Sequence, residues 1–388
     1  MTTIVKAANA AAFLTLVPRM LGFHPTQSLV LIPFARSRSL GAMRVDLPDD
    51  EPDALDRVAS TVIGMACRIA DADAVAFVVY TDARFDAGGG VPHADLMSAL
   101  ERRADACGLH VTDALCVAAD AWRRYLDADG PALGHPLSEL DAIDARDALE
   151  NLPPETEPAG DQASGAELPE VDLAEKERVG RAIAALREAV GLVCGSQADE
   201  PAHPNADEPR IDPLALAAMC TLDDLPTLFE AALAWRPDAL EPYQTAALGW
   251  CLSRPALRDI ALVQWVGGMD AGDEAFDAQL RWEAGEEYPA HLAMHMWGEG
   301  EQPDPARLHT ALELVRHVAA AVPREGRPGP LATCAWMAWA LGRSTHADVY
   351  ARQACEIEPE HGLAEIVRSF VHVGHLPEWA FQRGGTAT

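Results

Sequence analysis

The sequence predicts a two-part chain: an N-terminal mixed-sheet α/β layered domain, of the α+β or α/β class, followed by an all-helical, tetratricopeptide-like C-terminal region. Its 388 residues exceed the roughly 100–200 residues typical of one domain. Strand and helix patterns alternate over residues 1–135, an acidic and proline-rich stretch covers 136–212, and helical periodicity fills 213–388. We therefore expect an α/β domain, a linker with a short helix, and a helical-hairpin domain.

Four apolar runs predict the strands of the first domain. The run over residues 74–80 (AVAFVVY) is almost continuously apolar, as expected of a strand covered on both faces. Two earlier runs are joined by a basic turn around Arg36 and Arg38, and a last run follows Gly108. These other runs cover residues 28–34 (SLVLIPF), 42–47 (AMRVDL) and 110–119 (HVTDALCVAA).

Apolar residues at helical spacing predict the helices between these strands. A short helix is expected over residues 7–20, a second over 55–69 and a third over 94–107, which Gly108 ends in the usual C-terminal position. After the first helix, the order β-β-α-β-α-β is typical of a mixed α/β layered domain.

The middle of the chain predicts a linker. Residues 151–172 contain six acidic residues, four prolines and no basic residue. Such a segment buries too little apolar surface to offset its conformational entropy. A helix is expected over 173–193, and a second break rich in proline and aspartate follows over 197–213.

Helical patterns recur after Pro213, separated by glycine or proline turns. One stretch, residues 328–361, has the spacing of a tetratricopeptide unit, with Gly342 at the turn, Ala347 and Ala354 at small packing positions and Pro359 at the close. No second unit repeats at this spacing, so the pattern predicts a helical hairpin. The expected helices cover residues 214–234, 243–252, 256–266, 274–282, 305–321, 331–341, 347–357 and 363–373.

The charge of the chain disfavours several classes of function. Sixty acidic residues against 30 basic ones give a formal charge of −30. Phosphate backbones and anionic lipids attract basic surfaces, so we expect neither general nucleic-acid binding nor membrane binding. No apolar stretch reaches the roughly 18–20 residues of a membrane span, which favours a cytoplasmic protein.

The sequence predicts no cofactor and no metal site. The two lysines, Lys6 and Lys176, lie outside any phosphate-binding or Schiff-base context. The eight cysteines form no CxxC pair, which favours buried free thiols over zinc or redox sites. His291 and His295 share a helical face, but Leu292 stands where a zinc protease has its glutamate, so surface or partly buried helical histidines are favoured. The alternative is a metal site completed by a third ligand such as His309 or Glu299.

Two motifs stand out near the start of the chain: LGFHPTQSLVLIPF (21–34), with a Leu-Gly-Phe-x-Pro pattern, and MRVDLP (43–48), with an Arg-Val-Asp-Leu-Pro strand end. Both resemble the opening of an uncharacterised actinobacterial family, the domain of unknown function 4192. Further similarities are VVYTD (78–82), the region of Trp122, Arg258-Asp259 and IEPEHGLA (357–364). The resemblance spans most of the chain outside the acidic middle. It implies fold and origin, and no catalytic residues.

Polar residues that follow apolar strands are candidate ligand-binding groups. Asp46 and Asp82 each follow a strand, Arg44 lies on the same strand face as Asp46, and His24 precedes the first strand. Ligands in α/β sheets bind where strands end, so these four side chains form a candidate site if they converge. The alternative is that each aspartate caps the next turn or helix.

Tryptophans recur through the helical region, and Trp336 and Trp339 are candidates for contact with a partner. Tryptophan buries a large area between helices, so packing is the simpler interpretation. The concave faces of stacked helical hairpins nevertheless bind peptides in many proteins.

Three hypotheses of function follow. The first is a protein-interaction or adaptor module that binds a protein partner through the helical region, favoured because no catalytic signature is present. The alternative is an enzyme or sensor that binds a nucleotide or small molecule at the strand ends of the α/β domain. A third hypothesis treats the acidic surface as a mimic of nucleic acid.

Overall fold

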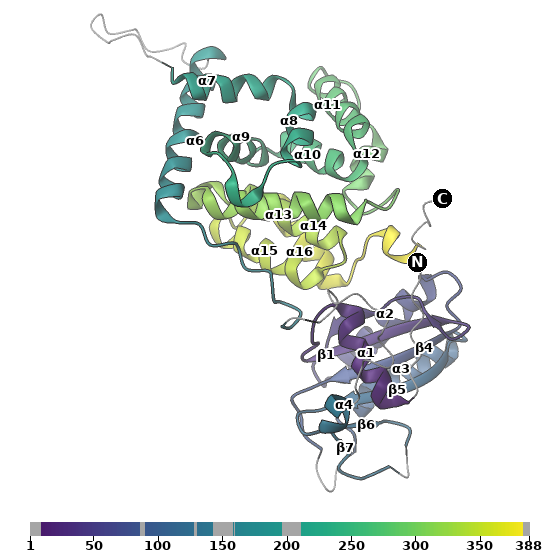
Figure 1. Cartoon of the computed structure of the whole chain (residues 1–388). Helices are drawn as coiled ribbons and strands as arrows, with labels where there is room; N and C mark the ends of the chain where they lie inside the picture. The colour runs from purple at the N-terminus through teal and green to yellow at the C-terminus, as the bar shows by residue number, and fades with distance from the viewer. Residues whose placement is uncertain are drawn as a thin grey trace, which may run out of the picture. The chain divides into compact units, whose positions relative to one another are not determined.

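The computed structural model describes residues 9–85, 90–127, 130–142, 158, 160–195 and 211–382. It divides into a sheet unit, residues 1–164 with 381–385, and a helical unit, residues 165–380 with 386–388 (Figure 1). The predicted fold class is confirmed, because a mixed sheet with helices comes first and a helical region follows. Much of the predicted acidic linker, residues 143–157, 159 and 196–210, lies outside the described residues.

The described part of the sheet unit contains a mixed seven-stranded sheet with the order β2-β1-β4-β5-β6-β7, in which β3 also pairs with β1. β4 and β5 are parallel, and the other paired strands are antiparallel. The strands are β1 (Ser28–Ala35), β2 (Arg38–Ser39), β3 (Met43–Asp46), β4 (Ala74–Tyr80), β5 (His110–Val117), β6 (Ala121–Arg124) and β7 (His135–Pro136).

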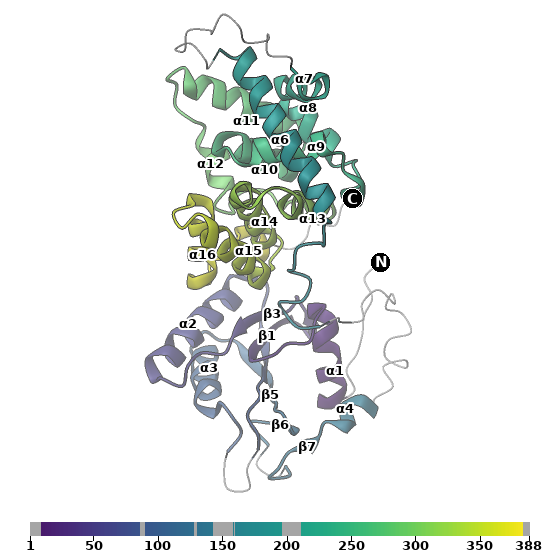
Figure 2. The same ribbon diagram turned by 90° about the vertical axis from the view of Figure 1, so that its left-hand side faces the viewer.

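Helices cover both faces of this sheet. Figure 2 shows α1 (Ala10–Leu21) on one side of the strands, and α2 (Pro52–Arg68) with α3 (Ala94–Ala106) on the other. Every residue of β4 is buried, which matches its continuous apolar run. Alternate residues of each strand therefore enter two cores, one under α1 and one under α2 and α3. A short helix, α4 (Ser138–Ala142), follows β7.

Short polar signals set the ends of these elements. The Asn9 side chain accepts a hydrogen bond from the backbone N–H of Ala12 at 2.8 Å and caps α1. Gly22 ends that helix with a left-handed φ of 82°, which glycine adopts without a steric penalty. Arg36 and Ser37, with φ of 51° and 79°, make the tight turn from β1 to β2.

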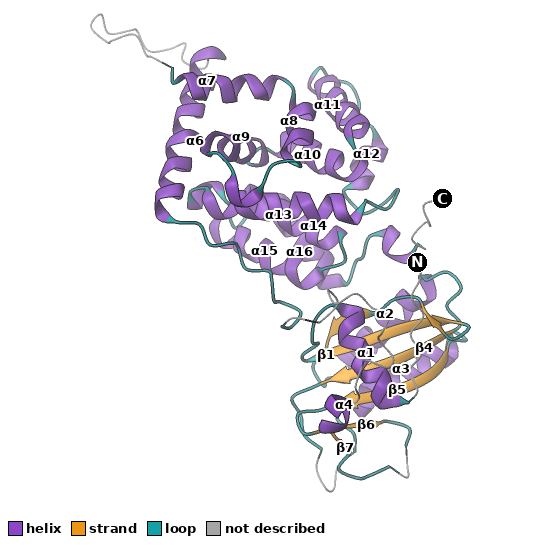
Figure 3. Ribbon diagram, in the orientation of Figure 1, coloured by secondary structure: helices purple, strands orange, loops and turns teal. Residues whose placement is uncertain are grey.

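The described helical unit contains helices and no strand (Figure 3). Proline begins many of these helices, at a position where its missing N–H costs nothing. The helices are α6 (Leu173–Val193), α7 (Pro213–Cys220), α8 (Leu225–Ala232), α9 (Pro242–Leu252), α10 (Pro255–Gly267), α11 (Met269–Glu283), α12 (Ala290–His295), α13 (Pro305–Ala321), α14 (Pro328–Ala340), α15 (Ser344–Ile357) and α16 (Gly362–Val373), with 3-10 turns at η2 (Thr221–Asp223), η3 (Pro237–Ala239), η4 (Arg324–Gly326) and η5 (Glu378–Phe381).

Helix α14 is the centre of the helical core. All thirteen of its residues are buried, because α9, α10, α13, α15 and α16 pack around it. Gly342, with a φ of 76°, makes the turn into α15, and Ala347 and Ala354 are fully buried in the packing between the helices. The predicted helical hairpin over residues 328–361 is therefore present.

Two helical expectations differ from the structure. The segment 214–234, expected as one helix, is α7 and α8 separated by a 3-10 turn, because Asp224 accepts the N–H of Thr227 and begins a new helix before Pro226. Helix α6, which the sequence placed inside the linker, packs against α9 as part of the helical unit.

The eight cysteines are free, but their burial differs from the expectation. Cys116, Cys251 and Cys334 are buried, whereas the other cysteines are exposed or half-buried. Burial raises the pKa of the Cys116 and Cys251 thiols to about 12. Within the described ranges, none of the helices has both the length and the apolar character needed to cross a bilayer.

Candidate functional site

The strand register brings two of the predicted residues to one edge of the sheet. Asp46, at the end of β3, and Tyr80, at the end of β4, both pair with Ser28 at the start of β1. Val117, at the end of β5, pairs with Tyr80. The carboxyl ends of β3, β4 and β5 therefore share one edge, which we call the strand-end edge, and Asp46 and Asp82 both lie on it.

Arg44 and Asp46 form a fixed pair on the strand-end edge. The Arg44 Nε donates to the Ser28 hydroxyl at 2.7 Å, and its Nη2 donates to Asp46 Oδ1 at 2.5 Å. The Arg44 side chain is 9% exposed, whereas that of Asp46 is 84% exposed. The arginine is thus held against the sheet, and the carboxylate of Asp46 faces water.

The other two candidate ligand-binding residues, Asp82 and His24, have exposed side chains. Asp82 is exposed, and its backbone N–H donates to the Gln27 Oε1 at 3.0 Å. His24 is also exposed, and its backbone N–H donates to the carbonyl of Gly160 at 2.9 Å. Neither the Asp46 nor the Asp82 carboxylate accepts a backbone N–H from a described residue, so the structure shows no capping by either side chain.

A second polar group on the same edge was missed by the sequence analysis. The Thr81 hydroxyl lies 3.2 Å from Nε2 of His93, and Nδ1 of His93 lies 3.6 Å from Oδ1 of Asp50. These residues come from the end of β4, the start of α3 and the loop before α2. No fixed spacing relates the three positions, so no local sequence pattern could have indicated them.

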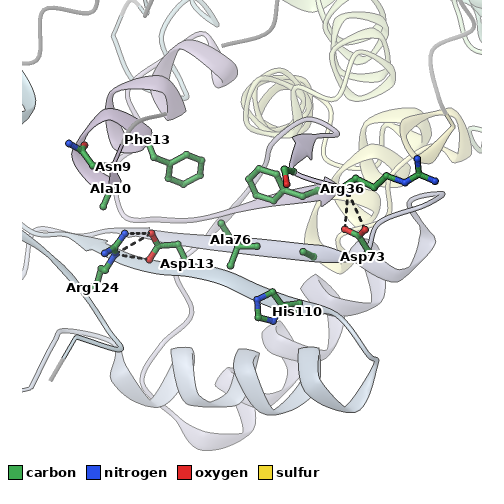
Figure 4. A pocket seen from close by; sticks show the side chains of 13 residues that line it. Asn9, Ala10, Phe13, Arg36, Asp73, Ala76, His110, Asp113 and Arg124 are labelled. Atoms are coloured by element: carbon green, nitrogen blue, oxygen red, sulfur yellow. Dashed lines mark hydrogen bonds and ion pairs between the residues drawn. The ribbon is translucent and has the colours of Figure 1, made fainter. Parts of the chain in front are cut away.

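A cavity of about 570 Å³ opens at the opposite edge of the sheet, beside α1 (Figure 4). Phe13 and Phe34 face it, with ring centroids 6.4 Å apart. Its acidic groups are engaged, because Asp113 accepts from Arg124 at 3.0 Å and Asp73 accepts the backbone N–H of Arg36 at 3.1 Å. None of the four predicted ligand-binding residues lines this cavity.

Trp336 and Trp339, the predicted partner-contacting residues, are fully buried. The Trp336 indole N–H donates to the carbonyl of Met296 at 2.9 Å, and that of Trp339 donates to the carbonyl of His375 at 2.8 Å. Their side chains fill the interior because α14 is enclosed on all sides. They line no surface that a partner could contact directly.

An exposed surface lies one layer outward from Trp339. The Phe370 ring packs on Trp339 with centroids 4.7 Å apart, and Trp297 packs on Phe370 at 5.2 Å. A cavity of about 470 Å³ is lined by Trp297, Phe370, Ile366 and Val373. We call this surface the α16 groove.

A second cavity, of about 630 Å³, shares Trp297 and Ile366 with the α16 groove. Its lining contains the Arg258–Asp259 ion pair, with Nη2 and Oδ1 2.8 Å apart. Burial raises the pKa of Asp259, and burial together with the charge of Arg258 lowers the pKa of His361. The two segments Arg258-Asp259 and 357–364, which the sequence analysis singled out, thus meet at one cavity.

The histidine pair of the HLAMH segment has structural partners. His291 Nε2 lies 2.8 Å from Glu274 Oε1. His295 packs against Trp379, and burial lowers its pKa. In the part of the chain that the structure describes, no group of three His, Cys, Asp or Glu side chains is arranged to hold a metal ion.

These features define a class of protein: a mixed α/β unit with polar groups along one strand edge, joined to a helical unit with an exposed apolar groove. The chain belongs to the family described as Domain of unknown function (DUF4192), whose model matches residues 11–378. No curated protein and no solved structure matches the chain.

Proposed function

We propose that the protein is an interaction or adaptor module that binds a segment of a protein partner in the α16 groove. The observation that carries this proposal is the clustering of large exposed apolar side chains in one depression. Trp297 is 50% exposed, Ile366 40% and Val373 63%, and all three line the same cavity. Contiguous apolar surface of this kind is typical of binding sites in proteins that are otherwise well packed.

The charges around the groove indicate the chemistry of the partner. Glu365 lines the groove itself, and Glu325, Glu358 and Glu360 are exposed around the adjoining cavity. A segment that combines apolar residues with Lys or Arg complements this surface, because its cations meet carboxylates and the face of Trp297. A nucleic acid does not, because its phosphates would be repelled.

The helical architecture supports the same proposal. The hairpin of α14 and α15, followed by α16, presents a surface made by successive helices, and its sequence spacing resembles a tetratricopeptide unit. Surfaces of this kind bind extended or helical segments of other proteins. In this proposal Trp339 supports the groove from beneath, through Phe370.

Selection of a random peptide library on the intact chain tests the proposal. We expect enriched peptides to pair apolar residues with Lys or Arg, and their affinity to fall as salt rises. Trp297→Ala should weaken a selected peptide about thirtyfold, as expected for a buried interface tryptophan. Trp282→Ala is the matched control, because Trp282 is 54% exposed on α11 and lies outside the groove.

Three results would contradict this proposal. The first is a selection that enriches acidic peptides. The second is equal loss of affinity in the Trp297 and Trp282 variants, and the third is affinity that does not depend on salt. The composition of the selected peptides decides the first result, and fluorescence polarisation with the labelled peptide, measured over a range of salt for both variants and the parent chain, decides the other two.

A second candidate function is small-molecule or nucleotide binding at the strand-end edge. The strand register favours this function, because Asp46 and Asp82 lie on the same edge. Arg44 is held there by hydrogen bonds to the Ser28 hydroxyl and to the Asp46 carboxylate. The exposed carboxylate of Asp46, fixed by Arg44, and the exposed carboxylate of Asp82 on the same edge are suited to a ligand that carries hydroxyl or amino groups.

A thermal-shift screen with nucleotides, divalent metals and common metabolites tests this second function. A ligand at about 100 times its dissociation constant should stabilise the protein by about 2.7 kcal/mol. Asp46→Asn and Asp82→Asn should each abolish the shift, whereas Asp105→Asn, at the far end of α3, should retain it. A shift that survives both edge variants would place the ligand elsewhere and refute this candidate.

A further inference from the structure

Three residues on the strand-end edge, Thr81, His93 and Asp50, lie in the order of a nucleophile, a base and a carboxylate. They occupy the face of the sheet that α2 and α3 cover, because Thr81 contacts His93 at the start of α3. Arg44 pairs in register with Val30, whose side chain lies in the core under α1. The two polar groups therefore share an edge but lie on opposite faces of the sheet.

The contacts around Thr81 leave its hydroxyl hydrogen able to point at His93. The backbone N–H of Ala83 donates to the Thr81 hydroxyl oxygen at 3.2 Å. The hydroxyl hydrogen is then free to be donated to Nε2 of His93 at 3.2 Å. When Nε2 accepts, the ring proton is on Nδ1, which is buried without a hydrogen-bond partner among the described residues and lies 3.6 Å from the Asp50 carboxylate, close enough for that charge to stabilise a protonated ring.

Surrounding contacts hold both Thr81 and His93 in place. The backbone N–H of Thr81 donates to the carbonyl of Val117 at 3.0 Å, which anchors it to β5. The Tyr125 hydroxyl donates to the carbonyl of Pro92 at 2.6 Å, immediately before His93. His93 itself has a left-handed φ of 58°, a conformation that is uncommon outside glycine and recurs at functional sites.

We propose that Thr81, His93 and Asp50 form a relay for acyl transfer from an ester substrate, an activity separate from the peptide-binding function proposed for the helical unit. The Thr81 oxygen attacks the ester carbonyl carbon while His93 Nε2 takes the hydroxyl proton. The alcohol leaves with that proton, and the acyl group stays on Thr81. Water then attacks the acyl carbon, gives its proton to His93, and releases the carboxylic acid with the regenerated hydroxyl.

The charge of the edge sets the class of substrate. Asp50, and Asp82 next to Thr81 in the chain, are exposed there, which disfavours phosphate esters and other anions by repulsion. Neutral or cationic carboxylic esters fit this field. Thr81 is only 8% exposed, so a small acyl donor is required to reach its hydroxyl.

Acetylation of the full chain by p-nitrophenyl acetate tests the relay. The expected result is an acetyl group on the peptide containing Thr81, found by mass spectrometry after a short reaction and acid quench. The two lysines, Lys6 and Lys176, are the internal standard for unspecific acetylation. Removal of the base in His93→Gln should slow acetylation of Thr81 by about 10²–10⁴-fold while lysine labelling stays constant.

Further variants separate the relay from a structural role. Thr81→Ser keeps the nucleophile and should be acetylated at residue 81, whereas in Thr81→Val the same peptide should carry no acetyl group at that position. Asp50→Asn should slow the reaction by at most about fivefold, because the Asp50 side chain is 86% exposed and screened by water. Thr112→Val, at the opposite end of β5, is the matched control and should retain the full rate.

The relay is refuted by Thr81 labelling no greater than that of Lys176, or by labelling that is unchanged in His93→Gln. Thermal melting of each variant identifies any that has lost its fold. If Thr81→Val fails to fold, the comparison of Thr81→Ser with His93→Gln still tests the relay. Thr81→Ser retains the histidine that accepts the proton, and His93→Gln removes it. Binding of peptides in the α16 groove is measured separately, so failure of either proposal is distinguishable from failure of the other.

Discussion

Replacing Trp339 with alanine should destabilise the helical unit by about 3–5 kcal/mol, the cost of emptying a large aromatic site in a packed core. The Trp339 ring is fully buried and contacts the rings of Trp336, Phe370 and Trp379. Its indole N–H also donates to the carbonyl of His375, which holds the chain after α16. Loss of the ring removes all these contacts at once.

Thermal unfolding followed by tryptophan fluorescence measures this effect. Of the nine tryptophans, all but Trp122 lie in the helical unit, so the signal reports mainly on that unit. We expect the midpoint to fall by roughly 6–20 °C, at ~2–4 °C per kcal/mol for a unit of this size. Trp282→Ala, an exposed site, should change the free energy of unfolding by less than about 0.5 kcal/mol. Equal midpoints for both variants would show that Trp339 does not support the core.

The contrast between Trp339 and Trp297 shows where sequence reasoning succeeded and where it stopped. The packing interpretation of the tryptophans holds for Trp265, Trp336 and Trp339, which are fully buried, and is wrong for Trp282 and Trp297, which are 54% and 50% exposed. The sequence of α14, PGPLATCAWMAWA, is apolar on all sides, and a helix of that kind is buried among other helices. This pattern indicates that the two tryptophans of α14 are buried. The exposed Trp297 carried no such sign, since its burial depends on where α16 packs.

In the sheet unit, the sequence located the strands but did not determine which of their residues lie close together. The apolar runs located β1, β3, β4 and β5 within a few residues, because each run must enter a core. Asp46 and Asp82 were found because they follow such runs. Whether they share an edge depends on the antiparallel pairing of β1 with its neighbours, which is set by contacts distant in sequence.

The relay residues were beyond sequence reasoning for a similar reason. Thr81, His93 and Asp50 belong to three segments that meet only after α2 and α3 have packed on the sheet. The short elements β2, β6, β7 and α4 were also missed, because two to five residues carry too little periodicity to detect.

Gly329→Ala should destabilise the helical unit by about 3 kcal/mol, at the upper end of the cost of forcing atoms into a filled core. Gly329 lies in the first turn of α14, where that helix crosses the end of α9. An added Cβ would lie 2.2 Å from the carbonyl oxygen of Leu252 and 2.9 Å from the Cα of Ser253. Both neighbours are backbone atoms, so no side-chain rotation relieves the clash and the two helices must move apart.

Gly191→Ala is the matched control for Gly329→Ala. Gly191 lies in α6 of the same unit, and an added Cβ there meets nothing within 4 Å. Alanine should therefore stabilise the helix by about 0.5–1 kcal/mol, because it restricts the unfolded chain more than glycine does. The two substitutions add the same methyl group, and chemical denaturation should move their midpoints in opposite directions. If Gly329→Ala proved as stable as Gly191→Ala, the close crossing of α9 and α14, and with it the enclosure of α14 that buries Trp336 and Trp339, would be wrong.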